Sequence, residues 1–247
     1  RESPAEAPTN AVRGFLDMIA TLVDRHRPDH FVACWDDDWR PAFRVEAIPS
    51  YKTHRVAADG EEEVPDDLSP QVPVIVDCLA ALGLPRLGAA GFEADDVIGT
   101  LAYAARGHMA VDVVTGDRDL FQLVDDASAC RVIYTARGGV RDPDLVDEEF
   151  LRTRYAVASG DAYADFAVLR GDSSDGLPGV AGIGEKTAAT LLSTFGDLAG
   201  IRAAIDSGDP RIKGAQRARL EAGAAYLDVA PRVVRLARDV PIPELDF

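Results

Sequence analysis

Apolar residues recur along this chain with two different spacings, and each spacing predicts one kind of element. A repeat every three or four positions is typical of a helix with one buried face, and it predicts helices at 11–25, 70–83 and 94–106. Short continuous apolar runs are typical of buried strands, and they predict strands at 31–35, 110–115 and 131–134. Strands that alternate with helices favour an α/β fold with a mixed, mainly parallel sheet and helices on both faces.

The second half of the chain is organised differently. From residue 145 to about residue 238 the apolar spacing is helical throughout. This change predicts an α/β core at 1–144 and a helical region at 145–247, which we expect to form a single compact unit. Residues 57–70 are acidic and poor in apolar side chains, so they are expected to form a mobile loop.

Composition indicates an intracellular protein with an ordinary core. The chain has 247 residues with 47% hydrophobic content and no run of 18 apolar residues, so we expect no membrane span. No signal-peptide pattern opens the chain. The chain has three cysteines, an odd number, and each lies in an apolar stretch: Cys34, Cys78 and Cys130. Buried free thiols in a reducing cytoplasm are the simplest interpretation.

The net charge of −16 argues against a simple nucleic-acid binder, but the charge is distributed unevenly. Residues 40–55 hold four Arg or Lys against one Glu, a net charge of +3, and residues 211–238 hold seven against two acids, a net charge of +5. Each basic run is either a solvated face or a contact surface for an anionic partner.

Most acidic residues with candidate chemistry fall into four short clusters. They are Asp36-Asp37-Asp38, Glu93-Ala94-Asp95-Asp96, Asp117-Arg118-Asp119 and Asp172-Ser173-Ser174-Asp175. The first and third follow predicted strands, and acids at strand ends can converge on one site. Any single cluster could simply cap a helix or a turn. Four clusters of oxygen ligands without His or Cys favour bound Mg²⁺ or Mn²⁺.

A glycine-rich segment at 176–188 follows the last cluster. Because Gly182 and Gly184 have no side chain, a phosphate can approach the backbone N–H groups closely, at the positive end of the next predicted helix. Lys186 and Thr187 can add contacts. The alternative is a plain glycine-rich turn between packed helices.

Together these segments resemble the flap endonuclease/5′-nuclease family, especially the 5′-nuclease domain of bacterial DNA polymerase I and its stand-alone relatives. The matching residues are 42–46 with 51–55, 91–102, 114–123 and 171–192, and the resemblance extends from about residue 11 to residue 236. It implies a PIN-like 5′-nuclease fold with a helical arch near 40–70 and a helix–three-turn–helix DNA-binding motif at 161–195.

The resemblance also implies roles for individual residues. One metal site matches Asp36, Glu93, Asp95 and Asp96, and the other matches Asp117, Asp119, Asp172 and Asp175. Arg44, Lys52 and Arg55 match the basic catalytic residues of the arch. Gly182, Gly184, Lys186 and Thr187 match the DNA-binding turn, whose carbonyl groups bind a monovalent cation, commonly K⁺, in the family.

Two departures from the family pattern bear on these roles. The family begins with a strand that ends in a metal-bridging Asp, and no such strand precedes Val12 in this sequence. If it is absent from the protein, metal binding is expected to be weakened. The family spacing before Phe43-Arg44 selects Asp37 as the first ligand, whereas the strand register selects Asp36, which we favour.

The expected function is that of a structure-specific 5′ nuclease, a flap endonuclease and 5′-3′ exonuclease acting in replication and repair. It would hydrolyse DNA phosphodiesters near 5′ ends, flaps and junctions with two or more Mg²⁺ or Mn²⁺ ions, and a DNA polymerase and a ligase are possible partners. The alternatives are an excised nuclease domain of a DNA polymerase I, a metal-impaired protein that binds DNA structures, and a PIN-type ribonuclease.

Overall fold

The protein is represented by a computed structural model that describes residues 8–57, 60, 62 and 64–243. Part of the loop predicted at 57–70, and the first seven residues, lie outside the described residues. The strands are β1 (Ala33–Cys34), β2 (Arg86–Leu87), β3 (Val111–Thr115), β4 (Cys130–Tyr134) and β5 (Asp144–Val146). The α-helices are α1 (Asn10–His26), α2 (Ala42–Ala47), α3 (Val72–Ala81), α4 (Ala94–Ala104), α5 (Glu148–Tyr155), α6 (Gly160–Arg170), α7 (Glu185–Phe195), α8 (Leu198–Asp206), α9 (Gly214–Ala222) and α10 (Ala224–Val234).

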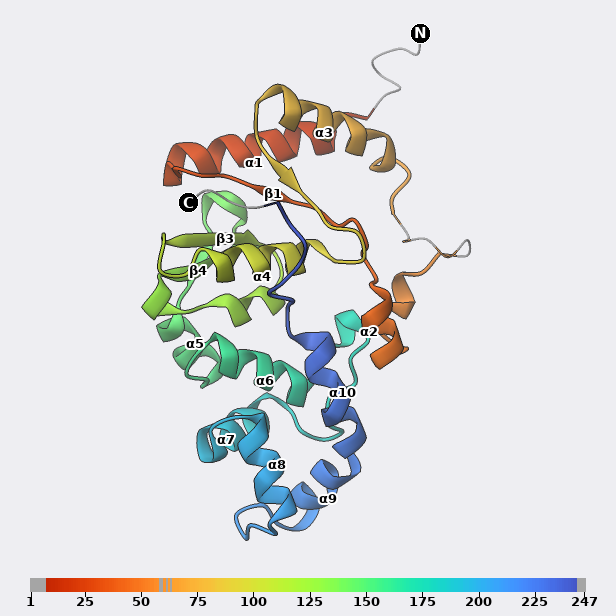
Figure 1. Ribbon diagram of the computed structural model, residues 1–247, viewed down its shortest axis with the longest axis vertical. Coiled ribbons are helices and arrows are strands. Elements are labelled where there is room, and N and C mark those ends of the chain that lie inside the picture. Colours follow the sequence, from red (N-terminus) through yellow and green to blue (C-terminus); the bar gives the residue numbers. More distant parts are fainter. Residues whose placement is uncertain (1–7, 58–59, 61, 63, 244–247) are drawn as a thin grey trace.

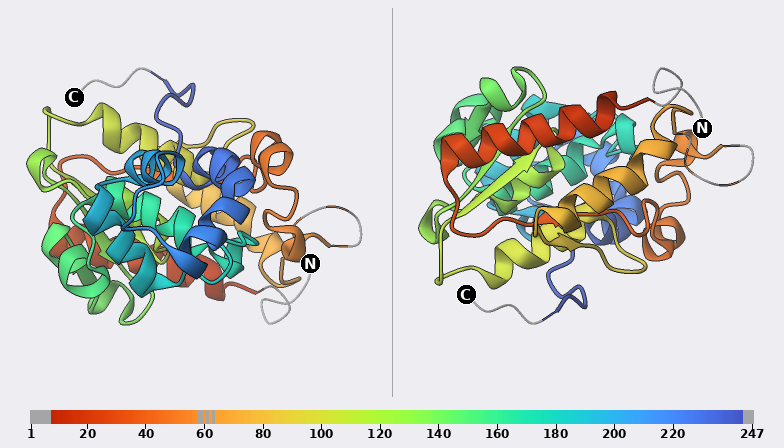
Figure 2. Two further views of the ribbon diagram at one scale, coloured as in Figure 1. Left: turned by 90° about the horizontal axis from the view of Figure 1, so that it is seen from below. Right: turned by 90° about the horizontal axis from the view of Figure 1, so that it is seen from above.

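The predicted mixed, mainly parallel α/β fold is confirmed, although the strands of the described residues divide between two sheets. β1 pairs in parallel with β2, β3 pairs in parallel with β4, and β5 is antiparallel to β4. Helix α4 contacts both β1 and β3 and so connects the two sheets. Figure 2 shows α1 on one side of the strands and α4 on the other. β2 and β5 were not predicted, because each is short and includes a charged residue, Arg86 or Asp144, so neither forms an apolar run.

Amphipathic patterning explains the elements that were predicted. The helices expected at 11–25, 70–83 and 94–106 form as α1, α3 and α4. Ile19 of α1 packs with Ile75 and Leu79 of α3, and Phe31 and Trp35 border this cluster. Burial of these side chains removes apolar surface from water, which holds the two helices together beside β1.

The main core lies between the β3–β4–β5 sheet and the helical region, and it positions the loop that follows β3. The ring of Phe121 packs 5.0 Å from that of Tyr134 on β4 and 5.4 Å from that of Tyr163 on α6. Leu120 and Phe121 have no exposed surface. Since these side chains anchor the short helical turn Asp119–Leu123, Asp119 is held at the edge of the core.

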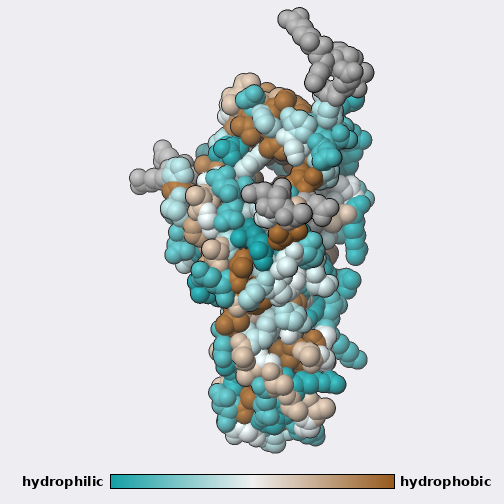
Figure 3. Space-filling model, turned by 90° about the vertical axis from the view of Figure 1, so that its right-hand side faces the viewer, coloured by the Kyte–Doolittle hydropathy of each residue, from teal (hydrophilic) through white to brown (hydrophobic). Residues whose placement is uncertain are grey.

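The molecule is elongated, with the α/β core at one end and helices α7, α8 and α9 at the other (Figure 1). α10 returns from that end to pack on α6 and α2. On the side that carries α2, hydrophilic residues are prominent around the middle of the surface and apolar residues lie in small groups (Figure 3). No helix in the described part of the chain has the length and apolar composition needed to cross a bilayer.

Candidate active site

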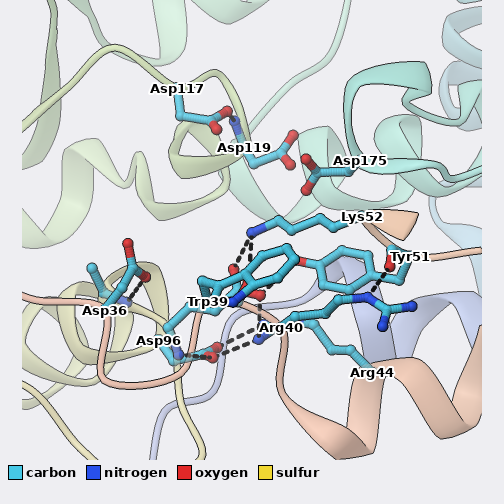
Figure 4. Close-up of polar contacts among 12 residues, drawn as sticks. Asp36, Trp39, Arg40, Arg44, Tyr51, Lys52, Asp96, Asp117, Asp119 and Asp175 are labelled. Atoms are coloured by element: carbon cyan, nitrogen blue, oxygen red, sulfur yellow. Dashed lines mark hydrogen bonds and ion pairs between the residues drawn. The ribbon is translucent and has the colours of Figure 1, made fainter. Parts of the chain in front are cut away.

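Three segments carry the predicted acids to one region of the α/β core. Asp36 follows β1, and its Oδ1 accepts a hydrogen bond of 2.7 Å from the backbone N–H of Ala94 at the start of α4. Glu93 and Asp95 flank that point of the chain, and Asp117 follows β3. In the close-up, Asp117, Asp119 and Asp175 lie in a row on one side of Lys52, with Asp36 and Asp96 on the other (Figure 4).

These carboxylates are close enough to shift one another's pKa. Burial, followed by the negative charge of Asp117, raises the pKa of Asp119 from its ordinary value of 3.8 to about 7. The same two causes raise the pKa of Asp95 well above its ordinary value. Burial also raises the pKa of Asp175, and the negative charge of Asp117 adds to this rise. Burial is the larger cause in each case, and nearby negative charge adds to it. Figure 4 shows Asp117 and Asp119 of the loop after β3 on the same side of Lys52 as Asp175 of the turn after α6.

Lys52 supplies a buried cation to this acidic site. Its Nζ donates a hydrogen bond of 2.8 Å to Glu93 Oε2, and the hydroxyl of Tyr51 donates one of 2.7 Å to Glu93 Oε1. Burial lowers the pKa of Lys52, but the charge and hydrogen bond of Glu93, with the charges of Asp175 and Asp95, together more than offset this, so that the pKa is raised. Lys52 therefore remains an ammonium ion inside the cluster.

The segment that carries Lys52 is fastened to the turn after α6. The backbone N–H of Lys52 donates to the carbonyl of Asp175 at 2.9 Å. Lys52 itself has φ +48, a left-handed conformation that is strained for a residue with a side chain. Gly176 has φ +70, and a Cβ there would lie 2.2 Å from the carbonyl oxygen of Ser50, so glycine is required. This packing holds Lys52 at the acids.

Arg55, the second predicted cation, also reaches the site. Its Nη2 donates to the carboxylate of Asp175 at 2.9 Å and to the carbonyl of Ser174 at 3.0 Å. The Arg55 side chain is 37% exposed, so it can contact a bound substrate. Asp172 lies in the same turn, where its Oδ2 is 3.1 Å from Arg170 Nη2.

Arg44 and Asp96 form a buried ion pair next to the converged acids, and their predicted roles stay predictions. The Arg44 guanidinium donates two hydrogen bonds to Asp96, of 2.6 and 2.7 Å, and a third of 3.0 Å to the carbonyl of Val233 on α10. Arg44 is 2% exposed and Asp96 is fully buried. Asp96 also accepts the N–H groups of Glu93 and Ala237. In this structure the pair joins α2, α4 and α10, and Arg44 Nη1 also lies 3.8 Å from Glu93 Oε1, at the buried side of the acidic site.

The first acidic cluster also separates into distinct positions. Asp36 contacts the start of α4 beside Asp95, whereas the carboxylate of Asp37 lies 3.7 Å from Arg86 and packs against Gly88. The arrangement brings Asp36 and not Asp37 to the other acids. Its role as a ligand stays a prediction.

The chemistry of the converged acids fits a hard divalent cation. Their donors are carboxylate oxygens, which Mg²⁺ and Mn²⁺ prefer. A bound dication would favour the ionised form of Asp119, whose pKa is raised by burial and by the charge of Asp117. Among the described residues, however, no three His, Cys, Asp or Glu side chains are arranged to hold one ion together. Lys52 and Arg55 neutralise Glu93 and Asp175 instead.

The glycine-rich turn lies beyond the acids, before α7. Val180 and Ile183 are buried and anchor the turn, while Gly182, Gly184 and Lys186 are exposed. Gly182 has φ +78, which favours glycine, and a Cβ at Gly184 would meet no atom within 4 Å. The backbone N–H groups at the start of α7 thus lie on an open surface at the positive end of the helix. Thr187, also predicted to bind DNA, directly follows Lys186 in the first turn of α7 and is half-buried.

Comparison with known proteins identifies the family. Residues 1–156 match the N-terminal resolvase-like domain of 5′-3′ exonucleases, and residues 158–246 match their C-terminal domain, described as a SAM fold. The chain belongs to the 5′-3′ exonuclease family. It is 60% identical to a 5′-3′ exonuclease of Streptomyces coelicolor over 98% of this chain and 81% of that protein. It is 49% identical to one of Mycobacterium tuberculosis over 97% and 78%.

DNA polymerase I of Mycobacterium bovis is 38% identical to this family member over 96% of the chain, but the match spans only 25% of the polymerase. Solved structures share the fold at low identity. A phage T5 5′-exonuclease with bound zinc has a TM-score of 0.71 at 19% identity, covering 94% of this chain and 82% of that one. The catalytic core of Rad2 with DNA has a TM-score of 0.51 at 16% identity, covering 92% and 67%.

Several residues of this exonuclease-family site were not predicted from the sequence. Tyr51 orients Glu93, and Arg40 donates a hydrogen bond of 2.7 Å to the carbonyl of Tyr51. Arg219 of α9 donates to the carbonyl of Gly182 at 3.2 Å and so adds a cation beside the turn. Basic and aromatic residues near the motifs were the available signal, but their contacts depend on the folding of distant segments.

The raised pKa of Asp119 predicts a pH dependence of stability without added metal. Between its unfolded pKa near 4 and its folded pKa near 7, the folded chain holds a proton that the unfolded chain releases. The stability that protonated Asp119 gives the folded chain is fully present below the unfolded pKa, and it is lost as the pH rises through the folded pKa. In EDTA the Tm should therefore fall from about pH 5 to about pH 8. Asp119→Asn should reduce this slope, while the raised pKa values of Asp95 and Asp175 keep part of it.

Asp209 provides a control for that titration. Hydrogen bonds from Arg211 lower the pKa of Asp209 to about 2, so its titration lies below the tested range. Asp209→Asn should leave the slope of Tm against pH unchanged. Equal slopes for the wild-type chain and Asp119→Asn would show that Asp119 does not hold the proton.

Proposed function

We propose that this chain is a divalent-metal-dependent 5′ nuclease that hydrolyses DNA at 5′ ends, flaps and junctions. The observation that carries the proposal is the convergence of Glu93, Asp95, Asp117, Asp119 and Asp175 around the Lys52 ammonium, with a phosphate-accessible turn on the same chain. Bound divalent ions would activate a water molecule and stabilise the leaving oxygen. Lys52 and Arg55 would place positive charge at the reacting phosphate.

A cleavage assay tests this function directly. A 5′-flap DNA should be cut in Mg²⁺ or Mn²⁺, leaving 5′-phosphate and 3′-hydroxyl ends, and EDTA should stop the reaction. Single-stranded RNA of the same length serves as the comparison substrate. Preferential cutting of the RNA would favour a PIN-type ribonuclease and overturn the proposal.

A melting experiment tests the metal ligands separately from activity. A ligand that binds only the folded state stabilises it by mass action, by about 2.7 kcal/mol at a hundredfold excess over Kd. Saturating Mn²⁺ should therefore raise the Tm by several degrees, and combining Asp117→Asn with Asp119→Asn should abolish the rise. Asp17→Asn, on the exposed face of α1, is the control and should keep it. A full rise in the double variant would place the ions elsewhere.

The glycine-rich turn is proposed to grip the DNA backbone, and Gly184 tests this. Its φ of −92° and its open surroundings allow a larger side chain without strain. Gly184→Val should thus fold normally. It should weaken binding of duplex DNA by about tenfold or more, because the branched side chain would prevent a phosphate from reaching the backbone and charged hydrogen-bond donors of the turn. Gly14→Val, at another open glycine on α1, is the matched control. Wild-type affinity in folded Gly184→Val would rule out this contact.

Finer aspects of the proposal follow from the family. We also propose that the carbonyl groups of the turn bind a K⁺ ion and that a DNA polymerase and a ligase are partners of this chain. The proposed location is the cytoplasm. The free thiols of Cys34, Cys78 and Cys130 are compatible with a reducing compartment.

A second candidate is a DNA-structure-binding protein with impaired metal binding. It is favoured by the finding that no three ligand-type side chains among the described residues are arranged around one point. Such a protein would bind flap DNA with normal affinity but would show neither a Mn²⁺-induced rise in Tm nor cleavage. A 5′-nuclease domain derived from a longer polymerase would, in contrast, cut the DNA.

A further inference from the structure

A surface pocket of about 590 Å³ lies between the acidic site and the glycine-rich turn. Its walls come from the loop after β3, the end of α6 with the following turn, and the first residue of α7. The lining residues that matter here are Arg118, Arg170, Asp172 and Glu185. Arg118 is not used in the nuclease site described above, and Arg170 enters it only as the ion-pair partner of Asp172.

Arg170 is a buried cation with one incompletely satisfied nitrogen. Its side chain is only 10% exposed, and its guanidinium lies 5.4 Å from the centre of the Phe166 ring. Nε donates to the carbonyl of Gly171 at 2.9 Å, and Nη2 donates to Asp172 at 3.1 Å. Nη1 is buried without a hydrogen-bond partner among the described residues. An unsatisfied buried donor of this kind costs about 1–3 kcal/mol, so it points to an acceptor that completes the site.

Glu185 lies where such an acceptor would bind. Its Oε1 is 3.7 Å from Arg170 Nη1, which is too long for a hydrogen bond. The Glu185 side chain is 52% exposed, so little burial opposes its movement. It is also the first residue of α7, where the helix dipole favours a negative group.

Arg118 supplies the second cation. Its Nη2 is 3.6 Å from Asp172 Oδ2, and its side chain is 40% exposed. Asp172 is otherwise occupied, because its Oδ1 accepts the N–H and the hydroxyl of Ser174. The pocket therefore combines two guanidinium groups, the positive end of α7 and one loosely held carboxylate, a combination suited to phosphate recognition.

We propose that the Arg118–Arg170 pocket binds a phosphate group of the DNA, and that Glu185 occupies the position of this phosphate in the free protein. The proposal rests on the proposed function and extends it. A phosphate held here would lie between the acidic site and the glycine-rich turn, and it would set the position of the strand relative to the acids. The phosphate is either an internal diester or a terminal 5′-monoester.

The test measures binding of a 5′-flap DNA by fluorescence anisotropy in EDTA, so that metal affinity does not contribute. Arg118→Gln should weaken binding roughly five- to tenfold, the scale of one charged hydrogen bond, and lower the slope of log Kd against log salt by about 1. Glu185→Gln should tighten binding several-fold, since it removes the competing charge. Arg152→Gln, an exposed arginine on α5, is the matched control and should bind like wild type.

Substrates with a 5′-phosphate or a 5′-hydroxyl distinguish the two sources of phosphate. If the pocket takes the terminal group, wild type should prefer the phosphorylated DNA and Arg118→Gln should lose that preference. If it takes an internal diester, Arg118→Gln should weaken both DNAs equally. Wild-type affinity in Arg118→Gln, or weaker binding by Glu185→Gln, would overturn the proposal. If the wild-type chain did not cleave DNA in the presence of metal ions, the proposed nuclease function would be refuted, whatever the binding results.

Discussion

Replacing Lys52 with alanine is expected to slow single-turnover cleavage of a flap DNA by about 10²–10³, the usual effect of removing one donor that stabilises charge in the transition state. Lys52 is 8% exposed and its ammonium lies 2.8 Å from Glu93, so water screens its charge only weakly. A contact used mainly in the transition state affects turnover more than binding. The Kd for the same DNA in Ca²⁺ should change only a few-fold.

Lys186→Ala is the matched control for Lys52→Ala. Lys186 is the same residue type, but it is exposed at the start of α7 and belongs to the proposed grip on DNA. Its removal should weaken binding and leave the saturated rate near wild type. If Lys52→Ala instead abolished binding while the saturated rate stayed normal, Lys52 would be a docking residue and the proposed catalytic role would be wrong.

Replacing Arg44 with alanine is expected to destabilise the protein by about 3–5 kcal/mol, because it leaves the carboxylate of Asp96 buried without its partner. In a chain of this size that loss lowers the Tm by on the order of 10 °C. The cause is structural, since Arg44 joins α2 to α4 and α10 through Asp96 and Val233. Thermal unfolding followed by circular dichroism measures the effect.

Arg13→Ala is the control for Arg44→Ala. Arg13 pairs with Asp17 on the surface of α1, where its side chain is 85% exposed, and such pairs contribute at most about 1 kcal/mol. Its removal should leave the Tm almost unchanged. An unchanged Tm in Arg44→Ala together with lost cleavage would mean that Arg44 acts at the reacting phosphate, as the family resemblance first implied.

Arg44 and Lys52 show why residue type and spacing could not separate the cations of this site. Both lie in the same short basic segment, and both match basic residues of the family arch. In the structure Arg44 donates its short hydrogen bonds to the fully buried Asp96 and lies 3.8 Å from Glu93, whereas Lys52 donates a hydrogen bond directly to Glu93. The partner is decided by how α4 and α10 pack against the segment, and those contacts join residues 52 to 189 positions apart for Arg44.

The sequence by itself determined the amphipathic helices α1, α3 and α4, the strands β1, β3 and β4, the acidic clusters and the glycine-rich turn. Each of these depends on local spacing or on the conformational freedom of glycine. The strand register already favoured Asp36 over Asp37, and the structure places Asp36 at the start of α4. Only the tertiary structure decided that the strands divide between two sheets, that Arg44 pairs with Asp96, and that Arg170 has a buried nitrogen facing Glu185. Strand pairing, burial and ion pairing join segments far apart in the chain, and their energies depend on desolvation and distance, which no local pattern specifies.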